Sequence, residues 1–583
     1  MTATSTETPP PTQTPTPTPP PTPIAAQTVR ETAPGQDTVT DLADLVLAVL
    51  AEEDPLEDSL EGCAETLGRL ADPSEDAQLA LRDRALALAH RAVRLTPPAG
   101  QERITRALVI QQAEAVAARL DARLVEHTLA DYQTSPLGRL LGSLPEGRPA
   151  GPDQEQGHLD RLAAVPGYLA AATERHRAGL AAGRPPVAER ARHAVGRLDA
   201  YLADPAADPL RAVPLTGERA AARDRLLEER VRPAFAVYRE VLAGELAPAG
   251  RPQERCGLSH LPQGQEVYAS LVRVHTTTDR TPEDLHRTGL DLLARLDEDY
   301  ARTGAKAFGS APGAAEVRHR LRTDAGLRWS GPGELLAVAR DSIARAQQAA
   351  PRRFGRLPSA PLALEGRAVP GAPQAWYMPA ALDGSRPGTY HANTDRAEER
   401  SRILAEATAF HEAVPGHHVQ ISLAQELEGL PRLRSLAWIN AYIEGWGLYS
   451  ERLADELGLY SGPLDRLGML AMDSLRAARL VVDTGLHHFG WSRERAVGFL
   501  RENTVLAEVE VQNETDRYVE WPGQALSYMT GRLEIQRLRA TAASRLGSRF
   551  DVRAFHDLVL GSGPLPLGVL DEVVGAWTDA RAR

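Results

Sequence analysis

Histidine and glutamate side chains are concentrated in one nine-residue stretch, Phe410–His418, which reads Phe-His-Glu-Ala-Val-Pro-Gly-His-His. Neutral imidazoles are the commonest protein ligands of zinc. A glutamate directly after the first histidine can take a proton from a water molecule that the metal holds. The stretch therefore predicts a zinc site with His411 as a ligand and Glu412 as the general base.

The spacing of these histidines differs from the His-Glu-x-x-His motif, in which the two histidines are four residues apart. Pro415 occupies the fourth position, and the next candidates are His417 and His418. On a regular helix they lie roughly 120° round the axis or roughly 10 Å along it, too far from His411 to share an ion. Because proline and glycine interrupt a helix, a bulge at 414–416 is expected to let two imidazoles meet. The competing interpretation is a helix that ends at Pro415, with surface histidines beyond it.

A second polar stretch, Asn440–Glu451, follows a predicted helix over residues 401–427. Glu444 has apolar neighbours, and a carboxylate in such surroundings is usually paired or bound to a metal. It is the candidate third ligand. Asn440, one helical turn earlier, is expected to orient that carboxylate. Glu451 and the charged residues after it are expected to lie on a solvated helix face.

Residues 362–394 contain short β-like segments between Pro and Gly turns. They predict a small antiparallel sheet beside the motif helix. Tyr390 and His391, in the last segment, are candidate substrate-binding residues, because an edge strand can pair with an extended peptide. An ordinary sheet without a substrate role is the alternative.

Three further side chains are candidates for contact with the substrate. Arg517 could bind a substrate carboxylate through its two-pronged guanidinium. Tyr528 could donate a hydrogen bond to an oxyanion, although it could also be a core tyrosine. His418 is a third candidate, if His417 is the metal ligand.

Two motifs resemble the bacterial family called domain of unknown function 885, namely His411-Glu412-x-x-Pro415-Gly416-His417-His418-x-Gln420 and Glu444-Gly-Trp-Gly-Leu-Tyr449. That family is similar to the gluzincin metallopeptidases, including the thimet-oligopeptidase-like enzymes. The likeness extends upstream to residues 257–264 and downstream to residues 517–531. The resemblance implies a zincin-like fold, Zn²⁺ at His411, His417 and Glu444, and Glu412 as the base.

The 583-residue chain is expected to be mainly helical. Residues 1–37 are a Pro/Thr-rich tail that should be disordered. Residues 38–255 and 256–583 are expected to form a helical first part and a catalytic second part, joined in one helical unit around a groove. The isolated cysteines, Cys63 and Cys256, are expected to be buried thiols.

The net charge of −12, without a basic block, argues against a nucleic-acid partner. No secretory signal and no run of membrane-spanning length is found, so no membrane partner and a cytoplasmic location are expected. A glycosylated extracellular stalk is the alternative for the Pro/Thr tail. We expect a monomer or a homodimer.

The function that these features favour is zinc-dependent hydrolysis of amide bonds in short peptides. An amide or ester hydrolase acting on a small metabolite would need the same ligands. A non-catalytic binding protein that retains the fold is the third hypothesis.

Overall fold

The computed structural model describes residues 38–60, 66–96, 98–149, 151–369, 372–382, 384 and 386–583. The expected Pro/Thr-rich tail and Cys63 lie outside these residues, whereas Cys256 is a buried free thiol. Residues 37–583 make up one compact unit. In the segments described, every helix is too short or too polar to traverse a lipid bilayer.

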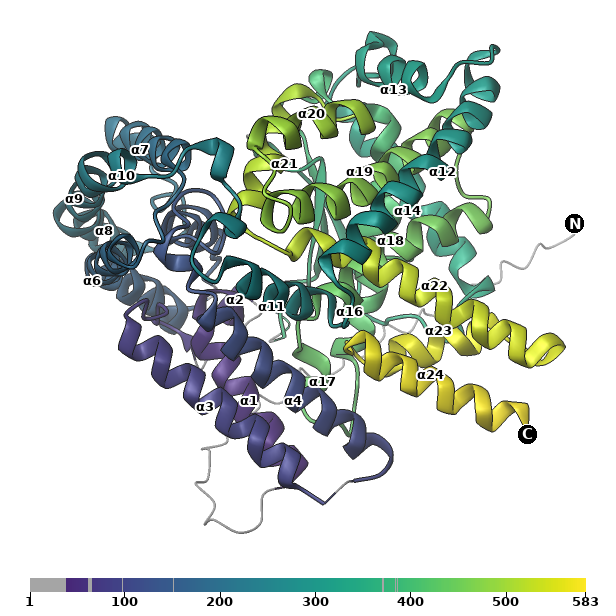
Figure 1. Cartoon of the computed structure of the whole chain (residues 1–583), viewed down its shortest axis with the longest axis horizontal. Coiled ribbons are helices and arrows are strands. Elements are labelled where there is room, and N and C mark those ends of the chain that lie inside the picture. The colour runs from purple at the N-terminus through teal and green to yellow at the C-terminus, as the bar shows by residue number, and fades with distance from the viewer. Residues whose placement is uncertain are drawn as a thin grey trace, which may run out of the picture. The chain divides into compact units, whose positions relative to one another are not determined.

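The first part of the chain is helical, as expected (Figure 1). Its first helix begins with a capping box, in which the Thr38 hydroxyl accepts from the backbone N–H of Asp41 and the Asp41 carboxylate accepts from that of Thr38. The helices of this part are α1 (Val39–Glu53), α2 (Pro55–Leu60), α3 (Glu75–Arg94), α4 (Gly100–Asp121), α5 (Pro136–Gly138), α6 (Pro152–Ala181), α7 (Ala188–Ala203), α8 (Gly217–Leu226), α9 (Arg232–Val241) and α10 (Ala247–Ala249).

The second part is also mainly helical. Its first α-helix is α11 (Gly264–Thr276). Helix α12 (Pro282–Phe308) begins with a proline after Thr281, whose hydroxyl accepts from the Asp284 N–H. The remaining helices are α13 (Ala314–Thr323), α14 (Pro332–Ala349), α15 (Ala405–Glu412), α16 (His417–Gln425), α17 (Leu433–Leu436), α18 (Asn440–Glu456), α19 (Pro463–His487), α20 (Arg493–Asn503), α21 (Glu508–Glu520), α22 (Ser527–Leu546), α23 (Val552–Gly561) and α24 (Leu567–Ala582).

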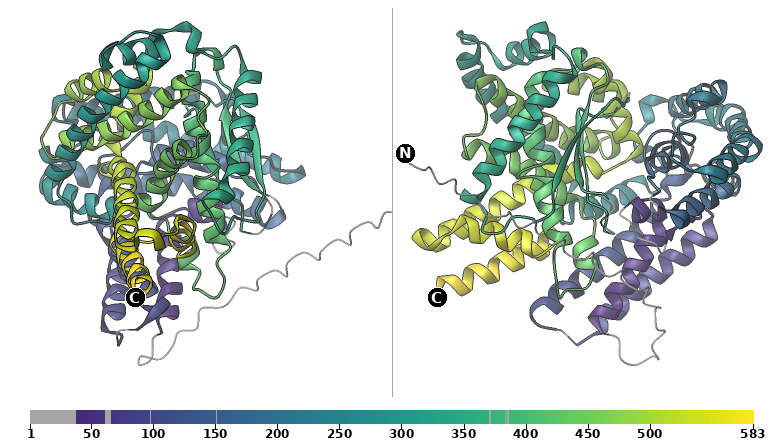
Figure 2. Two further views of the ribbon diagram at one scale, coloured as in Figure 1. Left: turned by 90° about the vertical axis from the view of Figure 1, so that its right-hand side faces the viewer. Right: turned by 180° about the vertical axis from the view of Figure 1, so that it is seen from behind.

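The small sheet lies where the sequence placed it, before the motif helix, but its topology is mixed. The strands are β1 (Leu362–Arg367), β2 (Ala375–Met378) and β3 (Gly388–Asn393), in the order β1-β3-β2. β3 runs parallel to β1 and antiparallel to β2, so the prediction of an antiparallel sheet was wrong. The reason is that β3 inserts between the two earlier strands. β2 is an edge strand and packs against α15. The right-hand view of Figure 2 shows the strands of this sheet beside the helices of the second part.

Helices α18 and α22 lie against each other and hold two segments of the site together. A Cβ atom added to Gly445 would lie only 2.5 Å from the Cα of Gly531. Both glycines therefore permit a backbone approach that larger residues would block. The contact brings the segment around Glu444 close to the one around Tyr528.

Candidate functional site

The motif stretch forms two helices joined by a tight turn. α15 ends at Glu412 and α16 begins at His417, so the predicted single helix with a bulge is instead a helix that stops and restarts. The Val414–Pro415 peptide is cis. A Cβ atom on Gly416 would lie 1.8 Å from the His411 carbonyl oxygen, so glycine alone fits the turn. The expected outcome holds, because the two imidazole rings meet with centroids 4.7 Å apart.

Three of the predicted ligands converge. Glu444 Oε2 lies 3.5 Å from Nε2 of His411 and 3.5 Å from Nε2 of His417. Ligand atoms at zinc–ligand distances of about 2.0–2.1 Å in a tetrahedral arrangement are about 3.3 Å apart. The three donor atoms, all within 4.8 Å of one another, therefore fit a divalent cation with one position left open.

The alternative second ligand, His418, points elsewhere. Its Nδ1 lies 3.2 Å from the hydroxyl of Tyr377 on β2 and 3.3 Å from that of Ser422. Burial lowers the pKa of His418 to about 4, so the ring is neutral at pH 7. The geometry thus selects His417 over His418. His418 instead supports the edge strand of the sheet, and its role in substrate binding stays a prediction.

Glu451 is the functional residue that the sequence analysis missed. It was expected on a solvated face, but its side chain is fully buried and its Oε1 accepts a 2.8 Å hydrogen bond from Nδ1 of His411. The bond leaves Nε2 of His411 unprotonated and directed at the ligand cluster when the ring is neutral. The available signal was the seven-residue spacing from Glu444, which places both carboxylates on one face of α18.

The charged forms of His411 and Glu444 stabilise each other. Burial opposes protonation of His411, but hydrogen bonds to Glu444 and Glu451 outweigh it and raise its pKa to about 9. Burial likewise disfavours the Glu444 anion, yet the two imidazoles hold its pKa well below the usual range. A metal cation bound at Nε2 of His411 would replace the proton on that nitrogen, because metal and proton compete for the same lone pair.

Replacing Glu451 by glutamine is expected to weaken metal binding about 10–100-fold, because the neutral amide orients His411 less strongly and leaves its Nε2 less basic. The dissociation constant should be measured by competition with a chelator. Glu456→Gln, on the exposed end of the same helix, is the matched control. An unchanged affinity in Glu451→Gln would show that the bond to His411 does not tune the site.

Glu412 is held against the edge of the sheet. Its Oε2 accepts a 3.0 Å hydrogen bond from the backbone N–H of Tyr377 in β2. Tyr377 lies opposite Tyr390 in the antiparallel pair, and its N–H points away from β3. One carboxylate oxygen is therefore fixed by main chain, while the other has no such bond among the described residues.

The predicted substrate strand is not an edge. Tyr390 and His391 lie in β3, which is bonded on both sides, so it has no free edge for a peptide. Tyr390 is 3% exposed, and the ring of His391 stacks on Trp376 at 5.2 Å. The prediction of an edge strand at these residues was wrong because strand order depends on pairing that local sequence does not encode. The strand whose outer edge faces the site is β2.

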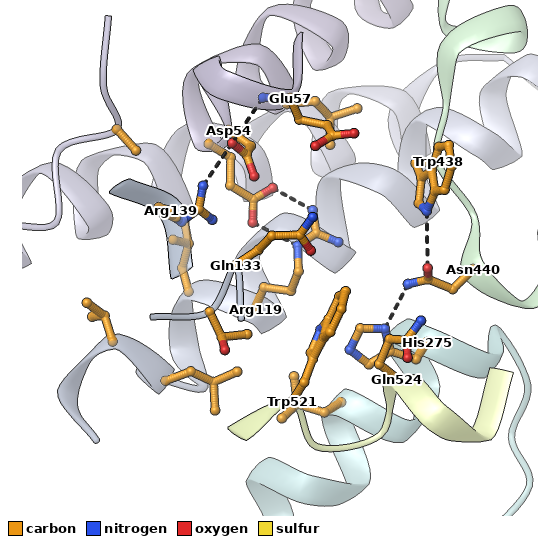
Figure 3. Close-up of a pocket in the computed structure, with 18 of the residues that line it drawn as sticks. Asp54, Glu57, Arg119, Gln133, Arg139, His275, Trp438, Asn440, Trp521 and Gln524 are labelled. Carbon is orange, nitrogen blue, oxygen red and sulfur yellow. Dashed lines mark hydrogen bonds and ion pairs between the residues drawn. The ribbon is translucent and has the colours of Figure 1, made fainter. Parts of the chain in front are cut away.

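A cavity of about 550 Å³ is lined in part by Glu444. Figure 3 shows other residues of its lining, among them Asp54, Arg119 and Asn440. One wall comes from the first part of the chain and carries two ion pairs, Glu53–Arg119 and Asp54–Arg139. The opposite wall comes from the second part and includes the sequence-predicted residues Asn440, Glu444, Arg517 and Tyr528. The cavity is thus lined both by Glu444, a candidate metal ligand, and by Tyr528, the predicted oxyanion donor.

The side chains of Arg517 and Tyr528 are hydrogen-bonded to each other. Nη2 of Arg517 donates to the Tyr528 hydroxyl at 3.1 Å and also to Gln524, while Nη1 contacts Glu514 at 3.4 Å. Because the Tyr528 oxygen accepts from a guanidinium, its own O–H is free to donate to another group. The arrangement suits a hydroxyl that must donate into the cavity.

Asn440 does not orient Glu444 as expected. Its Nδ2 donates to Nδ1 of His275 at 3.0 Å, and its Oδ1 accepts from Trp438 (Figure 3). Burial, with a smaller effect of Arg119, lowers the pKa of His275 to about 3, so this ring is neutral and can accept. A one-turn spacing placed Asn440 and Glu444 on one face, but the neighbouring helix α11 offered Asn440 a better partner.

Two solved structures share this fold. A putative lipoprotein from Colwellia psychrerythraea matches with a TM-score of 0.85 and 27% identity, over 93% of this chain and 100% of its own. A putative lipoprotein of unknown function from Shewanella oneidensis matches with a TM-score of 0.71 and 18% identity, over 92% and 99%, and shows the fold alone. No curated protein matches the chain. The family model described as bacterial protein of unknown function (DUF885) matches residues 55–574, and the chain belongs to that family.

Proposed function

We propose that this protein is a zinc-dependent hydrolase of amide bonds, with the metal held by His411, His417 and Glu444. The observation that supports it is the convergence of Nε2, Nε2 and Oε2 at separations expected for three corners of a tetrahedral site. The buried Glu451 behind His411 adds the carboxylate that commonly accompanies a ligating histidine. We also propose that the protein is similar to the gluzincin metallopeptidases and has their zincin-like fold.

When bound, zinc would supply a water molecule whose pKa is lowered to about 7 and would polarise the substrate carbonyl. Glu412 takes up the proton of the attacking water and passes it to the leaving amine. The Tyr377 N–H occupies Oε2 of Glu412, so Oε1 is the oxygen that carries the proton. Tyr528 donates its O–H to the developing oxyanion, a contribution of about 3–4 kcal/mol by comparison with other such donors.

The size of the cavity favours small substrates. About 550 Å³ lies within the range of pockets that enclose a drug-sized molecule. The wall formed by the first part of the chain bounds the cavity opposite Glu444, so a short peptide fits better than a folded protein. An amide or ester of a small metabolite would fit the same space, and a peptide library tested against acylated small amides separates the two. The expected cytoplasmic location and the monomeric or dimeric state stay predictions.

Metal content tests the proposal. We expect purified protein to bind one zinc ion per chain, and His411→Ala to lose both the metal and amide hydrolysis. His90→Ala, at an exposed position of α3, should retain both. The measurements are elemental analysis of dialysed protein and hydrolysis of a blocked-peptide library. Protein that binds no zinc when supplied with it would contradict the proposal and favour a binding protein that retains the fold.

A further inference from the structure

Three arginines surround the ring of Tyr528. The guanidinium carbons of Arg476, Arg479 and Arg517 lie 5.8, 4.5 and 5.8 Å from its centroid. Arg476 and Arg479 come from one face of α19, and they are 6% and 5% exposed. Such a concentration of buried positive charge is costly unless anions accompany it.

The carboxylates of this region do not match the arginines. Among the described residues, Glu514 alone forms an ion pair with any of the three, at 2.9 Å from Arg479 and 3.4 Å from Arg517. Arg479 and Arg517 thus share one carboxylate, and Arg476 pairs with none in the described part of the chain. The next acidic residue along α19 towards its N-terminus, Asp473, is already occupied by Arg452 and Arg532. The surroundings of Tyr528 therefore carry excess positive charge.

Arg476 is the arginine without an anionic partner. Its Nη1 lies 2.9 Å from the sulfur of Met472, a weak acceptor, and its buried Nε has no hydrogen-bond partner in the segments described. Nη1 of Arg479, one turn further along the helix, also lacks a partner. Buried guanidinium donors that the protein leaves unpaired are suited to an acceptor brought by a ligand.

The position of this cluster relates it to the cavity. Tyr528 and Arg517 both line the cavity, together with Glu444. Arg517 has its donors engaged by Glu514, Gln524 and Tyr528. Arg476 is not itself among the residues that line the cavity, but it lies 5.8 Å from the centroid of the Tyr528 ring, which does line it. Of the three guanidiniums it is the one without an anionic partner among the described residues.

We propose that Arg476 binds a carboxylate of the substrate, and that the preferred substrates are amides with a free carboxylate beside the scissile bond. Peptides that lose C-terminal residues and N-acyl amino acids both have this chemistry. The inference rests on the proposed hydrolase function. A charge-assisted, two-pronged contact between a guanidinium and a carboxylate supplies both the affinity and the register that place one amide bond over the catalytic groups.

The experiment compares blocked tripeptides that have a free C-terminal carboxylate with the same tripeptides as C-terminal amides. We expect the zinc-loaded enzyme to favour the free carboxylates by about 10–100-fold in kcat/KM, the usual worth of a hydrogen bond to a charged group. In Arg476→Met the ratio should fall to near 1, mainly through KM. Arg476→Lys, which keeps the charge, should retain part of the preference.

Arg495→Met is the matched control, because Arg495 is exposed and lies on the ring of Trp491, which, unlike Tyr528, does not line the cavity. It should keep the wild-type ratio. Equal rates on acids and amides with the wild-type enzyme would overturn the inference, even if Arg476→Met cannot be purified. An unchanged ratio in Arg476→Met would overturn it as well.

A binding measurement separates this inference from the proposed function. Calorimetry with the Glu412→Gln protein compares one tripeptide as the free acid and as the amide, without turnover. If the wild-type enzyme hydrolyses no amide but this protein binds the acid at least tenfold more tightly, and Arg476→Met removes the difference, the hydrolase proposal fails and the carboxylate site stands. If hydrolysis occurs and neither form binds preferentially, the carboxylate site fails alone.

Discussion

Replacing Glu412 by glutamine is expected to leave one zinc ion bound per chain and to lower kcat by about 10²–10⁴, the usual contribution of a positioned acid or base. Glutamine has nearly the same shape, and its carbonyl oxygen can still accept from the Tyr377 N–H that holds Oε2. It cannot take up a proton near pH 7. The effect should therefore fall on turnover and not on metal content or fold.

The measurements are kcat on the best peptide of the library and zinc per chain on the same preparation. Glu428→Gln, at an exposed position beyond α16, is the control and should have wild-type kcat. Full activity in Glu412→Gln would assign the proton transfer to another group. Loss of zinc with loss of activity would place Glu412 among the residues that hold the metal.

Replacing Gly447 by alanine is expected to weaken zinc binding by at least about 100-fold and to abolish hydrolysis. A Cβ atom at this position of α18 would lie 2.7 Å from both Cε1 and Nε2 of His411, and 3.0 Å from Cε1 of His417. Both imidazoles must move, and metal sites tolerate ligand displacements of only about 0.2 Å. The helix should persist, because alanine favours it over glycine by about 1 kcal/mol.

Zinc affinity by chelator competition and helicity by circular dichroism test this expectation together. Gly498→Ala on α20 is the matched control, since a Cβ atom there meets no other atom within 4 Å. It should bind zinc as the wild type does. Wild-type zinc affinity in Gly447→Ala would mean that the ligands are held less closely against α18 than the structure has them.

Much of the site follows from local chemistry. The sequence singled out His411, Glu444 and one of the adjacent pair His417 and His418 as candidate ligands, and only the family resemblance favoured His417. The histidine spacing also required an interruption of the helix at Pro415-Gly416 if two imidazoles were to meet. The chain breaks there, with Gly416 at the contact that admits no Cβ. The three strands also lie within the stretch 362–394 that was expected to contain them, since short segments between Pro and Gly turns are a local signal.

Two of the errors concern contacts between elements that are distant in sequence. Asn440 was paired with Glu444 by helix periodicity, but it bonds to His275 on a different helix. Tyr390 was placed on an edge, although strand order makes β3 central. Helix or strand periodicity indicates which residues share a face of an element. It does not indicate which other element packs against that face.

Glu451 shows the limit of what the sequence alone predicts about the site. Its sequence neighbours are charged, so composition predicted a solvated carboxylate, whereas burial against α15 makes it the hydrogen-bond partner of His411. The sequence by itself identified the candidate metal ligands, a candidate base, and an interruption of the helix at Pro415-Gly416. Only the tertiary structure decided which of two adjacent histidines converges, which carboxylate supports it, and which arginine stays unpaired, because those depend on distances between helices that no local pattern encodes.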